Sequence, residues 1–117
     1  MKVVISGGFG YLGQRLGKYF HDKGCIVFLG SRSKRNKPLW LKNGEVFITD
    51  WKNIHSCFYK IKSADLFIHC AGMNASQCLH NKEEAKIFNG SLTEKIIEAS
   101  IEIDIKDFLY LSTAHVY

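Results

Sequence analysis

A glycine-rich segment near the start of the chain, SGGFGYLG, constrains the fold more than any other feature. It follows the β-branched run Lys2–Ile5, which is typical of a short buried strand. After it, apolar residues recur at helical spacing, at Leu12, Leu16, Tyr19 and Phe20. The glycines therefore lie at a strand-to-helix turn. Such a turn is an anion site when a ligand can come close, because the first N–H groups of a helix have no partner within it.

The glycines of this turn follow a GxxGxxG spacing, and each is expected to have its own role. Gly7 takes the tight turn, Gly10 lets a pyrophosphate approach the backbone, and Gly13 lets the helix pack close to the sheet. The motif is informative here because it follows a strand, opens a helix and lies inside a βαβ unit. The sequence therefore predicts a dinucleotide-binding turn.

The rest of the chain alternates between strand and helix patterns. We expect strands at Lys2–Ser6, Cys25–Leu29, Glu45–Thr49, Asp65–Cys70 and Phe108–Leu111, and helices at Leu12–Lys23, Asn53–Ile61 and Glu83–Ser100. Nearly continuous apolar strands indicate a parallel sheet covered on both faces. Right-handed crossovers then give a doubly wound α/β fold with strand order 3-2-1-4-5 and a crevice at the carboxyl ends of the first and fourth strands.

Length and composition fit a single packed domain over residues 1–117, with 46% hydrophobic residues and one proline. The net charge of +5 comes largely from one loop, with Arg32, Lys34, Arg35, Lys37 and Lys42. Such a cluster can bind nucleic acid, lie free in solvent or hold a phosphate group. We favour a solvated loop or a phosphate site, and we expect no nucleic-acid partner.

No apolar run approaches the roughly 18 residues that span a membrane, and the N-terminus enters a strand directly, so we expect a cytoplasmic protein without a membrane partner. The four cysteines, Cys25, Cys57, Cys70 and Cys78, form no CxxC pair. We expect reduced thiols and no metal site.

The end of the second strand indicates which dinucleotide the turn prefers. NAD-binding folds usually carry a carboxylate there, which holds the ribose 2′-hydroxyl. This chain has Gly30, Ser31 and Arg32 instead. An arginine can fork onto a 2′-phosphate, and Ser31 supplies a second donor. The sequence therefore favours NADP, with NAD as the alternative; an exposed loop arginine without a ligand is the other interpretation of Arg32.

Five segments, in order, carry a resemblance to a known family: SGGFGYLG, TDW, DLFIHCAG, NGSLTEKIIEAS and FLYLSTAHVY. Together they resemble the extended short-chain dehydrogenases/reductases, the NAD(P)-dependent epimerase/dehydratase family. The resemblance implies a Rossmann fold and cofactor contacts from nine residues besides the glycines and the second strand. These are Tyr11, Leu12, Asp50, Trp51, Cys70, Ala71, Gly72, Asn74 and Asn89. From the residues alone, Asp50 could instead cap a helix, Trp51 could be core, and Asn89 could face solvent.

The resemblance also implies the chemistry. In this family a tyrosine acts as acid and base toward the substrate, a lysine four residues later lowers its pKa, and a Ser or Thr on the fifth strand hydrogen-bonds the reacting oxygen. Thr113 matches the Ser/Thr position, with Ser112 as its neighbour and runner-up. Tyr117 matches a structural tyrosine, and the family's catalytic Tyr-x-x-x-Lys pair, which would come after the fifth strand, is not in this sequence. The chain thus resembles the N-terminal part of such an enzyme, without the later strands and the substrate lobe.

We therefore expect the NAD(P)-binding part of a nucleotide-sugar epimerase, dehydratase or reductase, with hydride transfer on the nicotinamide and a nucleotide sugar as partner of the full-length enzyme. The alternative is a non-catalytic NADP-binding sensor or regulatory module. The fifth strand would form an open sheet edge, which can pair with a second copy to give a homodimer.

Overall fold

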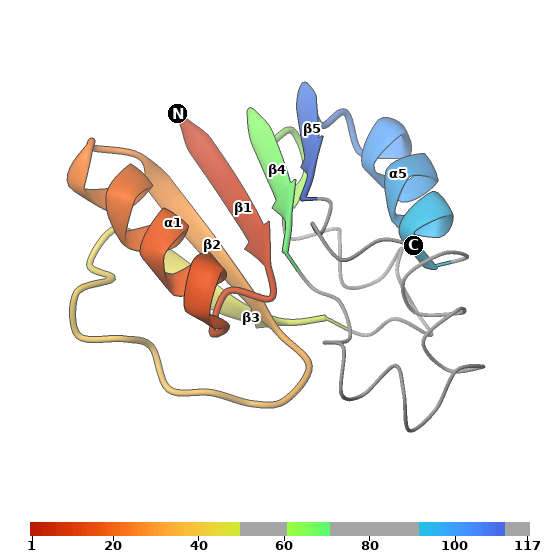
Figure 1. Cartoon of the computed structure of the whole chain (residues 1–117). Coiled ribbons are helices and arrows are strands. Elements are labelled where there is room, and N and C mark those ends of the chain that lie inside the picture. Colours follow the sequence, from red (N-terminus) through yellow and green to blue (C-terminus); the bar gives the residue numbers. More distant parts are fainter. Residues whose placement is uncertain (50–60, 71–91, 112–117) are drawn as a thin grey trace.

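The computed structural model describes residues 1–49, 61–70 and 92–111 (Figure 1). In chain order the elements are β1 (Lys2–Ser6), α1 (Tyr11–Asp22), β2 (Ile26–Ser31), β3 (Gly44–Ile48), β4 (Leu66–His69), α5 (Leu92–Glu102) and β5 (Asp107–Tyr110). Most of the helix expected at Asn53–Ile61 lies outside the described residues, as does the first part of the helix expected at Glu83–Ser100.

The five strands form one parallel sheet in the order β3-β2-β1-β4-β5, which confirms the predicted order. At the centre, Ile5 pairs with Leu29 on β2 and with Ile68 on β4. The carboxyl ends of all strands meet at one edge of the sheet. The residues that directly follow β1, β2 and β4, which are Gly7, Arg32 and Cys70, therefore lie at the same edge, as the doubly wound arrangement predicts.

Each face of the sheet carries its own apolar core, because successive strand side chains point to opposite faces. On one face Val3, Ile5 and Leu29 are fully buried against α1, which contributes Leu16 and Phe20. On the other face Val4 and Phe67 pack against Ile96 and Ala99 of α5. Figure 1 shows the two helices at either side of the sheet. The burial of both faces confirms the doubly wound fold.

One strand boundary bears directly on the site. The expected second strand ended at Leu29, but β2 continues through Gly30 and Ser31, which pair with Phe47 and Ile48 of β3. Glycine and serine are weak strand formers, so their own propensities favour a loop, and the partner strand decides their conformation. Arg32 is consequently the first residue after the strand.

Helix α1 lies close to the sheet at Gly17. A Cβ atom there would be 2.9 Å from Leu29 Cδ2 and 3.2 Å from Trp40 Cη2. No helix in the described part of the chain is both long enough and apolar enough to cross a bilayer.

Candidate functional site

The glycine turn between β1 and α1 is a tight backbone turn that depends on its glycines. Gly7 adopts a φ of +65°, a conformation that side chains disfavour, and its carbonyl accepts the N–H of Gly10 at 3.1 Å. Gly13 packs against the same carbonyl, because a Cβ on Gly13 would lie 2.1 Å from Gly7 O. The nearest neighbours of Gly13 thus belong to the turn itself, and the close approach of helix to sheet occurs at Gly17 instead.

The N-terminus of α1 is open toward solvent. Gly10 is the N-cap residue, makes no side-chain cap and has an extended backbone, with φ −75° and ψ 171°. A Cβ placed on Gly10 would meet only Gly7 O, at 3.4 Å. The first turn contains no acidic residue. The side chains of Tyr11 and Leu12 are 77% and 47% exposed. The positive end of the helix dipole therefore faces a space that an anion can enter.

A backbone hydrogen bond holds this turn against the end of β2. The N–H of Gly8 donates to Gly30 O at 2.9 Å. Ser31 follows directly and is buried, with its Oγ accepting the N–H of Ser33 at 3.3 Å. As an acceptor, the Ser31 hydroxyl keeps its own proton for donation. The side chain of Arg32 is exposed beside it. The two sequence signals for a dinucleotide, the turn and the strand end, thus lie side by side.

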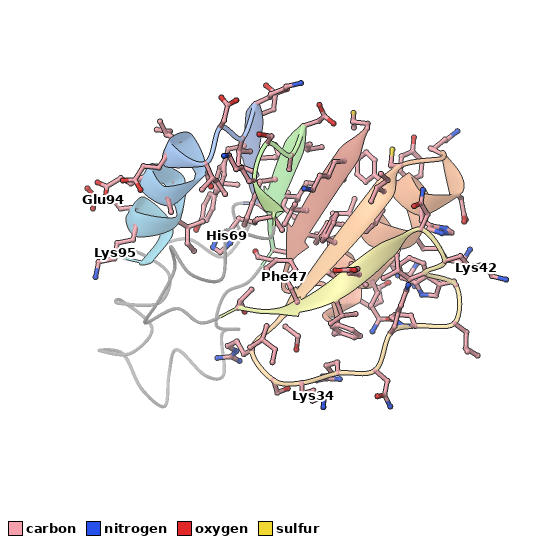
Figure 2. All side chains as sticks on the ribbon, turned by 180° about the vertical axis from the view of Figure 1, so that it is seen from behind. Lys34, Lys42, Phe47, His69, Glu94 and Lys95 are labelled. Carbon is pink, nitrogen blue, oxygen red and sulfur yellow. The ribbon has the colours of Figure 1, made fainter. Side chains whose placement is uncertain are left out.

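A second guanidinium lies at the turn. Arg35 Cζ is 5.3 Å from the ring centroid of Phe9, a cation–π distance. Phe9 is the residue between Gly8 and Gly10, so Arg35 lies over the turn. Figure 2 shows the side chains of Lys34, directly before Arg35, and of Lys42, near the end of the same loop. The site therefore has positive charge from the helix dipole, Arg32 and Arg35.

The carboxyl ends of β1 and β4 are joined by a buried polar contact. Ser6 Oγ lies 2.6 Å from Nδ1 of His69 and accepts the N–H of Cys70 at 3.1 Å. Burial lowers the pKa of His69 to about 4, so the ring is neutral at physiological pH and accepts the Ser6 hydroxyl proton at Nδ1. His69 is 2% exposed and lies beside the Tyr110 ring, with centroids 5.8 Å apart, so it packs as part of the core. Figure 2 shows His69 at the end of β4.

Cys70 follows β4 at this same edge and is partly buried. Burial raises the pKa of its thiol to about 11. The thiol is therefore protonated near neutral pH and presents a small neutral group at this edge of the sheet.

The structure gathers the predicted residues it describes at the carboxyl edge of the sheet. These are Gly7, Gly10, Tyr11, Leu12, Gly13, Ser31, Arg32 and Cys70. The remaining predicted residues lie outside the described part of the chain: Asp50, Trp51, Ala71, Gly72, Asn74, Asn89, Ser112 and Thr113. Within residues 1–49, 61–70 and 92–111, no three His, Cys, Asp or Glu side chains gather as metal ligands.

Two contacts at the site were absent from the sequence expectations. The stacking of Arg35 on Phe9 depends on how the loop after β2 folds back, and the basic composition of that loop was its only signal. The Ser6–His69 contact joins residues 63 positions apart. In the sequence, the only indication of this contact is that Ser6 and His69 are polar residues near the ends of two otherwise apolar strands.

Comparison with known proteins agrees with this geometry. Residues 3–117 match the model of the NAD dependent epimerase/dehydratase family. A curated relative, short-chain dehydrogenase/reductase family 42E member 1 from Xenopus laevis, is 33% identical over 117 residues, which are 97% of this chain and 30% of the relative. The Mus musculus protein of the same description is 30% identical over 118 residues, which again cover 97% of this chain and 30% of the relative. The chain thus spans about a third of the length of these relatives.

Solved structures share the fold at lower identity. The UDP-glucose 4-epimerase of Thermotoga maritima, solved with UDP-glucose, superposes with a TM-score of 0.79 at 19% identity, covering 97% of this chain and 38% of that one. MoeE5, solved with UDP-glucose and NAD, gives a TM-score of 0.81 at 20% identity, covering 100% of this chain and 38% of that one. With a family match over residues 3–117, the chain belongs to the NAD dependent epimerase/dehydratase family.

Proposed function

We propose that the chain is the NAD(P)-binding part of a nucleotide-sugar epimerase, dehydratase or reductase, with a preference for NADP. The observation that carries the proposal is the open N-terminus of α1, where Gly10 leaves room for a phosphate group against the first N–H groups of the helix. Family membership supports a nicotinamide dinucleotide as the ligand of this turn.

The residues around the turn fit the parts of a dinucleotide. Gly10, Tyr11 and Leu12 would hold the pyrophosphate, since the helix N-terminus offers N–H donors and a Cβ at Gly10 would fill part of that space. Ser31 and Arg32 would contact the adenosine ribose, because the Gly8–Gly30 hydrogen bond sets them beside the turn. The bound nicotinamide would supply hydride transfer.

The preference for NADP is supported by the charges at the end of β2. Gly30 and Ser31 offer no carboxylate that would hold a 2′-hydroxyl or repel a 2′-phosphate. Arg32 follows them directly, and Arg35 lies over Phe9. A guanidinium binds a phosphate through two parallel N–H bonds, which a 2′-hydroxyl cannot accept in the same way.

Two further parts of the proposal rest on relatives and on resemblance. UDP-glucose is bound in both structures named above, so a nucleotide sugar is the substrate class we propose for the full-length enzyme. Thr113, with Ser112 as the second choice, would bind the reacting oxygen of that substrate.

The proposal is tested by fluorescence titration of the chain with NADPH and with NADH at one fixed salt concentration. NADPH should bind at least about tenfold more tightly, because a hydrogen bond to a charged group is worth roughly 1.5–3 kcal/mol. Equal affinities would overturn the NADP preference, and a failure of both to bind would overturn the proposed function.

A further inference from the structure

The basic loop, residues 32–43, contacts the glycine turn near its start and α1 near its end. Near its start, Arg35 Cζ lies 5.3 Å from the ring centroid of Phe9, just before the first turn of the helix. Near its end, the backbone N–H groups of Lys42 and Asn43 both donate to Nε2 of His21, at 3.2 Å and 3.3 Å. Figure 1 shows this loop passing the N-terminal end of α1 and then running along the helix.

His21 belongs to the last turn of α1 and is largely enclosed, with its side chain 16% exposed. The ring of Trp40, from the loop, packs edge-on against it with centroids 5.7 Å apart. An imidazole nitrogen that accepts a hydrogen bond carries no proton, so the ring is neutral and its proton is on Nδ1. Nδ1 is buried, makes no hydrogen bond among the described residues and lies 3.5 Å from Asp22 Oδ1.

Protonation would reverse the role of Nε2. A doubly protonated imidazole only donates, so the N–H groups of Lys42 and Asn43 would both face a donor. The charged groups that the structure places by the ring are Asp22, whose Oδ1 is 3.5 Å from Nδ1, and Lys18 of α1, which is bound to Asp22 at 2.9 Å. From the loop, Lys42 contacts the ring through its backbone N–H. Asp22 favours a proton on Nδ1.

We propose that neutral His21 positions the basic loop by accepting these two N–H groups, and that protonation of His21 releases the loop and weakens the preference for a 2′-phosphorylated dinucleotide. The effect on dinucleotide preference rests on the proposed function, whereas the positioning of the loop by His21 does not. The link is preorganisation: a fastened loop holds Arg32 and Arg35 at the glycine turn before any ligand arrives, and a released loop must be ordered on binding.

The fastening is tested without cofactor by NMR, following the Lys42 and Asn43 amide signals between about pH 8 and pH 5.5, the range in which histidine usually titrates. In the wild type both signals should shift with the same midpoint as the His21 ring signals. In His21→Gln they should stay constant over that titration, because the amide oxygen of glutamine can accept both N–H groups and does not ionise. Amide signals that stay still while the His21 ring titrates would overturn the proposal.

The link to the ligand is tested by the ratio of NADPH to NADH affinity at the two ends of that pH range. The 2′-phosphate itself loses charge near pH 6, so part of any change in the affinity ratio comes from the ligand. His21→Gln is the matched control, because in this variant only that ligand effect remains. The ratio should fall about three- to tenfold further in the wild type than in His21→Gln, as expected for the loss of hydrogen bonds that order a binding loop. An equal fall of the affinity ratio in the wild type and in His21→Gln would overturn the effect of His21 on cofactor preference. If neither cofactor bound, the proposed function would be overturned, and the NMR titration would still decide whether His21 holds the loop.

Discussion

The N–H of Gly8 donates a 2.9 Å hydrogen bond to the carbonyl of Gly30, and this bond joins the two halves of the candidate site. It ties the glycine turn before α1 to the end of β2, where Ser31 is the last strand residue and Arg32 follows. The turn also approaches β2 closely, since a Cβ on Gly8 would lie 2.8 Å from Leu29 Cβ. The first residue of the basic loop, Arg32, is therefore held beside the helix N-terminus by the contact of the turn with β2.

The turn should not tolerate a methyl group at Gly13. In Gly13→Ala the new Cβ would stand 2.1 Å from Gly7 O, so the helix or the turn must move. The free energy of unfolding should fall by about 3 kcal/mol, the upper end for overpacking. Gly10→Ala is the control, because its Cβ meets only Gly7 O at 3.4 Å; it should cost about 1 kcal/mol or less. Urea unfolding of both variants measures the difference, and equal losses would show that the turn can relax around Gly13.

The Ser6 hydroxyl should contribute to stability through its position between β1 and β4. Ser6→Ala removes the group that Nδ1 of His69 and the N–H of Cys70 both contact, at 2.6 Å and 3.1 Å. Loss of a buried partner costs roughly 1–3 kcal/mol. Ser100→Ala is the control, since that equally buried hydroxyl donates only to Ile96 O within α5. Thermal unfolding should separate the two variants, and a Ser6→Ala protein as stable as Ser100→Ala would contradict this role.

Stability should decline in mild acid because of His69. Its ordinary pKa is 6.5, and burial lowers the pKa in the folded protein to about 4. The unfolded chain therefore binds the proton more tightly, so stability is full above pH 6.5 and is lost as the pH falls toward about 4. The loss over this window is roughly 3 kcal/mol.

His69→Asn is the variant that tests this assignment. Asparagine can accept the Ser6 hydroxyl proton, but it does not titrate. The unfolding free energy of the variant should therefore change less than that of the wild type between those two pH values. Parallel curves for the two proteins would assign the acid sensitivity to other groups.

The cofactor preference should depend on the two arginines and not on the general charge of the basic loop. Arg32→Ala should lower NADPH affinity by about tenfold and leave NADH nearly unchanged. Arg35→Ala should act in the same direction, because its guanidinium lies over Phe9 at the turn. Lys37→Ala removes an exposed charge of the same loop and is the control. Titrations at one salt concentration compare the three, and an equal effect from Lys37→Ala would contradict recognition by the arginines.

Much of the architecture could be predicted because its signals are local. The apolar run at Val3–Ile5 and the helical spacing of Leu12 and Leu16 predict a buried strand followed by a helix, and the turn between them predicts an anion site. The parallel order then follows from alternation of strands and helices. Five strands in the order β3-β2-β1-β4-β5 confirm that inference.

The remaining features depend on contacts between distant segments. Gly30 and Ser31 join β2 only because β3 pairs with them. Gly13 faces Gly7 O because of the path of the turn, which spacing alone does not define. Arg35 reaches Phe9, and Lys42 reaches His21, because the loop after β2 folds back along α1. Periodicity and motif spacing carry no information about how such a loop closes.

The central claim is that the open N-terminus of α1 binds the phosphates of a nicotinamide dinucleotide. It is tested most directly by titrating NADPH onto the wild type and onto Gly10→Ala, with unfolding curves to verify that both are folded. The wild type should bind saturably, and Gly10→Ala should bind at least about tenfold more weakly, because a methyl group would keep the phosphate from the helix N–H donors. Equal affinity in a folded Gly10→Ala protein, or no binding by the wild type, would contradict the claim.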